Sequence, residues 1–292
     1  MENLNEYIDL TSLGHSLGYI LVALTIFYIG KLAFKLSNAK TDITAELVHK
    51  DNFAFILSYV GYFVALVIVV GGAILGESLG FYTDLAHIGL YGVLGIVLLQ
   101  ISIRISNRLI LPNFDIKKEI LLDRNNGTGV IEASIYISNA LLLHGALIGE
   151  STSLQEGIIT FIAYWFIGNI MLIAASKIYT LWIRFDVHKE IEADNVAVGV
   201  SFSGAILAIG IVIMNALIDP FVDWTTTIVD VLLQTVLGII LLPIMRFVTD
   251  KVLIPERNLT DEIINQEKPN IGAGLIEAFA YVGSAILITW SI

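Results

Sequence analysis

Two copies of one short pattern hold the polar residues that could do chemistry. Each copy reads Asn-x-Gly-x-Gly-x-x-Glu-x-x-x-Tyr. Its polar members are Asn125, Glu132 and Tyr136 in the first copy and Asn270, Glu277 and Tyr281 in the second. Residues four and seven positions apart share one face of an α-helix. A carboxyl group between an amide and a hydroxyl on such a face could bind and release an ion or a proton.

The position of each glutamate decides how that chemistry would work. Glu132 and Glu277 come seven residues after the asparagine, which is two helical turns, or roughly 10 Å. A charged carboxylate in such an apolar run costs about 3 kcal/mol or more, so burial favours its protonated form or a polar partner. We therefore interpret both glutamates as a candidate ion or proton site. The alternative role is to lock neighbouring helices together.

Other kinds of chemistry have no support in the residue types. The chain has no cysteine, which excludes disulfides and thiolate nucleophiles. Its histidines are scattered without the spacing of a metal site, and no nucleophile elbow or phosphate-binding glycine loop is present. The net charge of −11 argues against nucleic acid as a partner. We expect a protein that is not an enzyme and that binds neither a metal nor a cofactor.

The segments that must position the glutamates are long and apolar. Hydrophobic residues make up 56% of the chain and charged residues only 15%. A helix needs about 20 apolar residues to cross a bilayer, and an open strand would leave its backbone unpaired in lipid. Eight stretches meet this requirement, near residues 13–36, 52–75, 84–111, 126–149, 155–183, 195–218, 227–254 and 270–291. The predicted fold is an all-α, polytopic integral membrane protein with about eight transmembrane helices.

The basic residues predict the orientation of these helices. All 16 Lys and Arg residues lie at the ends of odd-numbered spans or in the connections that follow them. The positive-inside rule places those connections in the cytoplasm, and both termini are then extracytoplasmic. Arg104 and Arg246 lie near the ends of the third and seventh spans. We expect their long side chains to reach the membrane surface.

The connections after the odd-numbered spans repeat one pattern. An acidic or amide residue, an apolar residue, two others, Glu and an apolar residue recur at 42–47, 115–120, 186–191 and 258–263. Apolar residues at i and i+4 predict a short helix that lies on the lipid headgroups, with the leading Asp or Asn as its N-cap. An asparagine then begins each even-numbered span, at Asn52, Asn125, Asn195 and Asn270. We predict that each one is a helix N-cap and that the small residues after it form a packing seam.

Alternate copies of this unit share further residues. The second and fourth copies share the glutamate, whereas the first and third share a glycine nine positions after the asparagine, at Gly61 and Gly204. This alternation divides the chain into two four-helix membrane halves, residues 1–150 and 151–292, each made of two related hairpins. Because every hairpin runs in the same direction, we expect parallel pseudo-symmetry about the membrane normal and not an inverted repeat.

These repeated residues carry a family resemblance. A charged loop that ends in Asn-x-Ala or Asn-x-Gly, followed by a glycine-spaced helix, resembles the domain-of-unknown-function 350 family of bacterial inner-membrane proteins. The resemblance covers nearly the whole chain as four tandem two-helix units. It implies a bacterial plasma (inner) membrane location and supplies no activity. The departures are Asn258, where the other copies have Asp, and Gly127 and Gly272, where the other copies have Ala.

Two functional hypotheses follow. The first is an ion or proton channel or transporter that uses the paired intramembrane glutamates. The alternative is a structural or envelope-stress membrane scaffold that recruits partners through its cytoplasmic loops. In both cases the lipid bilayer is the immediate partner, and further copies of the chain or other membrane proteins are candidate partners.

Overall fold

Eight long helices run through the residues that the structure describes. The structure is a computed structural model, and it describes residues 10–76, 78–112, 114–148, 153–183, 185–218, 223–254 and 256–291. The long helices are α1 (Leu10–Ser37), α2 (Phe53–Leu75), α3 (Phe81–Ile110), α5 (Asn126–Ile148), α6 (Leu154–Trp182), α8 (Val196–Ile218), α9 (Trp224–Val248) and α11 (Ile271–Thr289). All eight are long and apolar enough to cross a membrane, as the sequence predicts. The first residues of the helices differ from the predicted ones by at most three positions, and this largest difference occurs at Leu10, Phe81 and Trp224.

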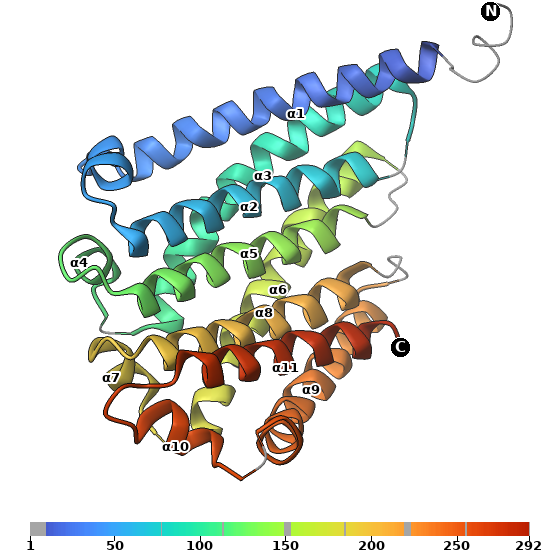
Figure 1. The fold of residues 1–292 in the computed structure, drawn as a ribbon. Coiled ribbons are helices and arrows are strands. Elements are labelled where there is room, and N and C mark those ends of the chain that lie inside the picture. Colours follow the sequence, from blue (N-terminus) through green and yellow to red (C-terminus); the bar gives the residue numbers. More distant parts are fainter. Residues whose placement is uncertain are drawn as a thin grey trace, which may run out of the picture.

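Short helices occupy the connections that carry the basic residues. They are the π-helical turns η1 (Ala45–His49) and η2 (Thr249–Leu253) and the helices α4 (Ile116–Leu121), α7 (Val187–Glu192) and α10 (Leu259–Ile264). Figure 1 shows α4, α7 and α10 at one end of the bundle, and the start of α1 and the end of α11 toward the other. We call the end that holds α4, α7 and α10 the basic end. The spans therefore alternate in direction along the chain.

The long helices form two layers. In the inner row, α2 packs on α5, α5 on α8 and α8 on α11, and all four run in the same direction (Figure 1). The outer row consists of α1, α3, α6 and α9. Of these, α3 contacts α2 and α5, α6 contacts α5 and α8, and α9 contacts α8 and α11. Each hairpin adds one helix to each row, which is the parallel pseudo-symmetry that the repeat predicts.

Small residues bring the inner-row helices close together near the basic end. A Cβ atom added to Gly129 would lie 2.4 Å from the carbonyl oxygen of Ala54. The same addition to Gly199 would meet the Cα atom of Gly127 at 2.5 Å. In a membrane, close packing of helix backbones replaces the hydrophobic drive that joins helices in water. The glycines four positions after the asparagine are therefore required by helix contact.

The apolar residues of the loop helices are buried inside the bundle. Ile120 is 3% exposed, and Ile191 and Ile263 are 0% exposed. The expectation that these helices lie on the lipid headgroups is therefore wrong for their apolar faces, which pack on the inner row. The i, i+4 pattern itself is the same for both arrangements, because it identifies an apolar face and not what covers that face.

Candidate functional site

Each inner-row asparagine caps its own helix. The side-chain Oδ1 atom accepts a hydrogen bond from the backbone N–H three residues later, which satisfies a donor that the helix itself leaves open. The bonds run to Asn52 from Phe55 (3.2 Å), to Asn125 from Thr128 (3.0 Å), to Asn195 from Val198 (3.2 Å) and to Asn270 from Ala273 (3.2 Å).

The amide nitrogen of each asparagine ties the loops together. It donates to the glutamate of the loop before it, which is Glu46, Glu119, Glu190 or Glu262. In the first three units it also donates to a carbonyl of the next loop helix, which belongs to Ile120 (2.9 Å), Ile191 (2.6 Å) or Ile263 (3.0 Å). These bonds commit Asn125 and Asn270 to the loops, and neither asparagine bonds to Glu132 or Glu277 in the described part of the chain.

Glu46, the first of the loop glutamates, is a charged partner in this ladder. Burial raises the pKa of Glu46, but hydrogen bonds from Lys50 and Asn52 outweigh that effect and hold the pKa below its ordinary value. The Nζ atom of Lys50 lies 2.5 Å from the Glu46 carboxylate. Two donors that point at one carboxylate stabilise its charged form. The repeated loop glutamate is thus a structural acceptor for the capping asparagine.

Glu277 lies in a complete polar network in the second half. Its Oε1 atom accepts hydrogen bonds from the Nε atom of Arg246 (2.6 Å) and the hydroxyl of Tyr281 (2.8 Å). Its Oε2 atom accepts from the hydroxyl of Ser201 (2.5 Å). The carboxylate is 1% exposed, so Arg246 neutralises a fully buried charge. Three donors from α8, α9 and α11 meet at this one side chain.

The guanidinium of Arg246 is part of the site, because it pairs with the buried Glu277 carboxylate instead of extending into solvent. Its side chain is 19% exposed, and it also donates to the hydroxyl of Thr260 at 3.0 Å. The expectation of a surface-seeking side chain is therefore wrong, because a buried carboxylate one helix away offers a stronger interaction than water at the interface. Arg104, by contrast, is exposed.

Glu132 has a sparser environment in the first half. One carboxyl oxygen accepts a hydrogen bond from the hydroxyl of Ser58, and the other accepts from the Nδ2 atom of Asn107 at 3.3 Å. No ion pair to Glu132 is present among the described residues. Around it, as in the rest of the described ranges, no three His, Asp or Glu side chains form a group that could hold a metal ion. Neutral donors alone hold this carboxyl group.

A small cavity lies against Glu132. Its volume is about 40 Å³, and its lining includes Glu132, Tyr136 and Ser58 together with Lys117 from α4 at the basic end. This is enough room for a water molecule beside a polar group. Tyr136 donates no hydrogen bond to Glu132 within the described chain, and its ring instead lies against Tyr62 at 5.3 Å. The tyrosine thus contacts the carboxylate directly in the second half only.

A wider groove opens on the other side of Asn107. It has a volume of about 570 Å³, and its lining includes Asn107 and the basic side chains of Arg104, Arg108 and Lys117. Asn107 therefore stands between the groove and Glu132, donating to the carboxyl group. Its own Oδ1 atom is buried and has no hydrogen-bond partner among the described residues. The first-half site is consequently close to two openings at the basic end.

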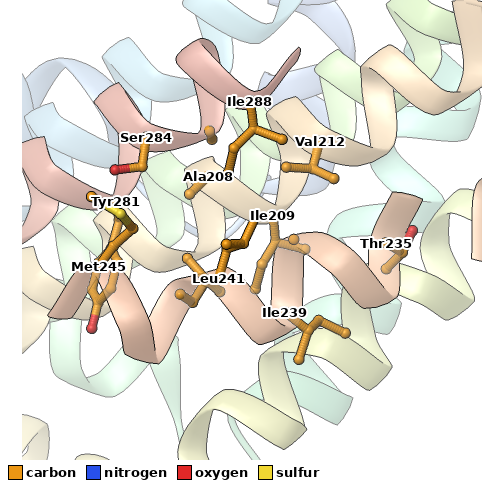
Figure 2. Close-up of a pocket in the computed structure, with 13 residues that line it drawn as sticks. Ala208, Ile209, Val212, Thr235, Ile239, Leu241, Met245, Tyr281, Ser284 and Ile288 are labelled. Carbon is orange, nitrogen blue, oxygen red and sulfur yellow. The ribbon is translucent and has the colours of Figure 1, made fainter. Parts of the chain in front are cut away.

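The packing around Glu277 leaves little space beyond Tyr281. Figure 2 shows Tyr281, Ser284 and Ile288 of α11 facing Ile209 and Val212 of α8 across a small void. This void measures about 10 Å³, and its lining is mostly apolar. A buried water needs two to four polar partners, and the Ser284 hydroxyl already donates to the Ala280 carbonyl at 2.5 Å. Within the described residues, the void beyond Tyr281 therefore offers a water few polar partners.

Both halves share the serine that reaches the glutamate. Ser58 and Ser201 lie six positions after their asparagines and belong to the odd copies, whereas the glutamates belong to the even copies. Gly61 and Gly204, which the first and third copies share, meet Ala133 and Ala278 beside the glutamates. In each half, the odd copy therefore supplies the serine and glycine of this helix contact, and the even copy supplies the glutamate and alanine. The serines were missed although this shared position after the asparagine was visible in the sequence.

Comparisons with known proteins agree with the repeated architecture. The family model Domain of Unknown Function (DUF350) matches residues 7–147 and again residues 153–292, so each match spans two hairpins. A curated relative, the UPF0719 transmembrane protein of Aquifex aeolicus (strain VF5), is 24% identical over 253 residues, which cover 85% of this chain and 89% of the relative. No solved structure matches. The chain is a multi-pass membrane protein that belongs to the DUF350 family and carries the family domain twice.

Proposed function

We propose that the protein carries protons through the membrane and that Glu132 is the group that binds them. The observation that supports this proposal is the contrast between the two glutamates. Glu277 is 1% exposed and paired with Arg246. Glu132 has only neutral donors and lines a cavity of about 40 Å³ that extends to Lys117. A carboxyl group without a fixed counter-charge can gain or lose a proton without breaking an ion pair.

The charges around the site favour a proton over a metal cation. Arg104, Arg108 and Lys117 line the groove next to Asn107. Three basic side chains repel a metal cation that approaches through this groove. A proton can instead pass along hydrogen bonds from water to the carboxyl group. The amide of Asn107 and the hydroxyl of Ser58 can donate to the charged carboxylate and so stabilise it after release.

Glu277 has a different role in this proposal. The guanidinium of Arg246 neutralises it, and the apolar void beyond Tyr281 offers no wet path. We infer that this glutamate holds α8, α9 and α11 together. The two copies of the motif have therefore diverged, one into a titrating site and the other into a fixed joint. Replacing Glu132 by Gln should therefore reduce proton flux, whereas replacing Glu277 by Gln should reduce stability.

Flux measurements in proteoliposomes test the proposal. Under an imposed pH gradient, wild-type protein is expected to dissipate the gradient, and Glu132→Gln is expected to reduce the rate to that of empty vesicles. Gln keeps the size of the side chain and one acceptor oxygen but cannot titrate. Glu132→Asp serves as the conservative control and is expected to retain part of the flux. Folded protein in each preparation is measured by thermal unfolding.

Two results would overturn the proposal. One is wild-type flux in the Glu132→Gln variant. The other is a loss of flux that matches a loss of folded protein, since this would give Glu132 the packing role. The absence of flux in wild-type protein under any ionic gradient, together with a partner captured on the loops, would support the scaffold hypothesis. That hypothesis has less support here because the repeated loop glutamates already bond to the capping asparagines of the same chain.

We also propose that the basic end faces the cytoplasm of a bacterium, with both termini on the outer side of its inner membrane. The distribution of all 16 basic residues supports this orientation. Protons would then reach Glu132 from the cytoplasmic side. No nucleophile or cofactor site supports an enzymatic role, so we propose that the protein acts without a chemical reaction.

A further inference from the structure

The inner row repeats one contact between neighbouring helices. Each helix has a leading face, which meets the next helix in the row, and a trailing face, which meets the preceding helix. The leading face lies at positions 2, 6, 9, 13 and 20 after the asparagine. Gly61 of α2, at position 9, meets Ala133 of α5, at position 8, and Gly204 of α8 meets Ala278 of α11 in the same way. The glycine Cβ would lie 2.4 Å or less from the alanine Cα in both pairs.

Within the part of the chain that the structure describes, no helix packs on the leading face of α11. Phe279 at position 9 is 69% exposed, and Trp290 at position 20 is 80% exposed. In α5 the residue at position 9, Ser134, is 2% exposed. A Cβ on Gly272 would approach only the side chain of Asn270, whereas one on Gly127 would meet Asn195 and Val196 of the next unit. The last helix thus repeats the inner-row surface without an inner-row partner.

The asparagine ladder is also open at this end. Asn52, Asn125 and Asn195 are at most 4% exposed, and each donates to the carbonyl of the following loop helix. Asn270 is exposed, and its amide donates to Glu262 alone within the described residues. Contact with lipid accounts for the exposure of the apolar Phe279. It does not account for the exposed amide of Asn270, because lipid offers no hydrogen-bond acceptor to replace the missing carbonyl.

The opposite end of the row has a matching vacancy. A groove of about 600 Å³ runs between α1 and α2, and its lining includes Tyr19, Phe27, Val67 and Gly71. In each later hairpin, the inner-row helix of the preceding hairpin packs against both long helices. Thus α2 packs on α3 and α5, α5 packs on α6 and α8, and α8 packs on α9 and α11. The α1–α2 groove is the one place of this kind that lacks such a helix among the described residues.

We infer that a second copy of this chain supplies the missing helix. The leading face of α11 in one copy packs into the α1–α2 groove of the next, which continues the inner row from molecule to molecule. Such a contact joins two different surfaces, so it closes into a ring or extends as a row. At position 4 after the asparagine, α2 has Ile56 where the other inner-row helices have glycine. Because isoleucine is larger, α11 of the neighbouring copy lies farther from α2 at this position than the inner-row helices within one chain lie from each other. This inference does not depend on proton transport.

Cysteine cross-linking in membranes tests the contact, since the chain has no cysteine of its own. The internal pair Gly61–Ala133 predicts that Phe279 of one copy lies opposite Val60 of the next, at positions 9 and 8. A chain that carries Val60→Cys and Phe279→Cys is expected to form a ladder of disulfide-linked oligomers under mild oxidation. Mixed single variants are expected to form dimers only, because each copy then has one reactive surface.

The control pair keeps Val60→Cys and moves the second cysteine to Ile170, which is 45% exposed in the middle of the outer row. It is expected to give no ladder. The inference is overturned if the Val60–Phe279 pair stays monomeric at normal abundance, or if it cross-links no better than the control pair. It is also overturned if Phe279→Cys alone forms dimers as efficiently, since α11 would then pack on α11.

Discussion

At the scale of single residues, the partners of the two glutamates give them different properties. Ser58 and Ser201 make the same contact in the two halves. The third helix of each half supplies the other donor, which is a neutral amide from Asn107 in α3 and a guanidinium from Arg246 in α9. The carboxyl group of Glu277 is therefore part of an ion pair, whereas that of Glu132 is held by neutral donors, which is the difference on which the proposed proton site depends.

Replacing one partner of the buried ion pair should destabilise the protein more than replacing both partners. Arg246→Gln or Glu277→Gln leaves one charge unpaired in the bundle, which costs about 3–5 kcal/mol. The double variant Arg246→Met with Glu277→Met removes both charges and is expected to recover most of that loss. Denaturant unfolding in detergent micelles measures the three free energies. Losses that simply add in the double variant would contradict a direct pair.

At the scale of the helices, small residues set the spacing of the inner row. Gly129, Gly199 and Gly274 each place a helix against the backbone two positions after the preceding asparagine. The ladder of asparagine bonds fixes the register, because each amide must reach the carbonyl of the next loop helix. Close contact and register together hold four parallel helices in one row.

A single methyl group at this seam should disturb the row. Gly199→Ala would bring a Cβ to 2.5 Å from the Cα of Gly127, and backbone atoms there cannot rotate away. Overpacking of this kind costs about 1–3 kcal/mol. Gly89→Ala is the matched control, since nothing lies within 4 Å of a Cβ at Gly89 in α3. Thermal unfolding of the two variants compares them, and equal midpoints would contradict the role of the seam.

At the scale of the whole molecule, four hairpins add one after another without a closing contact. The row begins at α2 and ends at α11, and both ends present surfaces that are covered everywhere between them. Tandem repeats of this type contact only their neighbours, so their terminal units remain incomplete. Assembly with further copies would complete them and would set the number of Glu132 sites in the functional particle.

The proposed orientation makes a prediction for the whole chain. A reporter enzyme that is active only outside the cytoplasm should be active when fused to the C-terminus, because eight spans return the chain to its starting side. The same reporter inserted in the connection between α1 and α2, near Lys40, should be inactive. The reverse pattern would place the basic end outside, and protons would then reach Glu132 from the opposite side.

Much of this fold could be predicted from the sequence because the signals are local. Apolar runs of sufficient length determine the eight spans, and their bounds differ little from those observed. The capping asparagines are equally local, since each bonds to a backbone group only three residues later. The repeat also predicted the parallel arrangement, because units of the same length and charge pattern must enter the membrane in the same direction.

The tertiary structure decided what the glutamates contact. Ser58 is 74 positions from Glu132, Ser201 is 76 positions from Glu277, and Arg246 reaches Glu277 from another helix. Such pairs depend on which helices become neighbours and how each is rotated, and hydropathy is silent about both. By itself the sequence presents Glu132 and Glu277 as equivalent. Only the packing of the outer row makes one a fixed ion pair and leaves the other with neutral donors, because it brings Arg246 to Glu277 and Asn107 to Glu132.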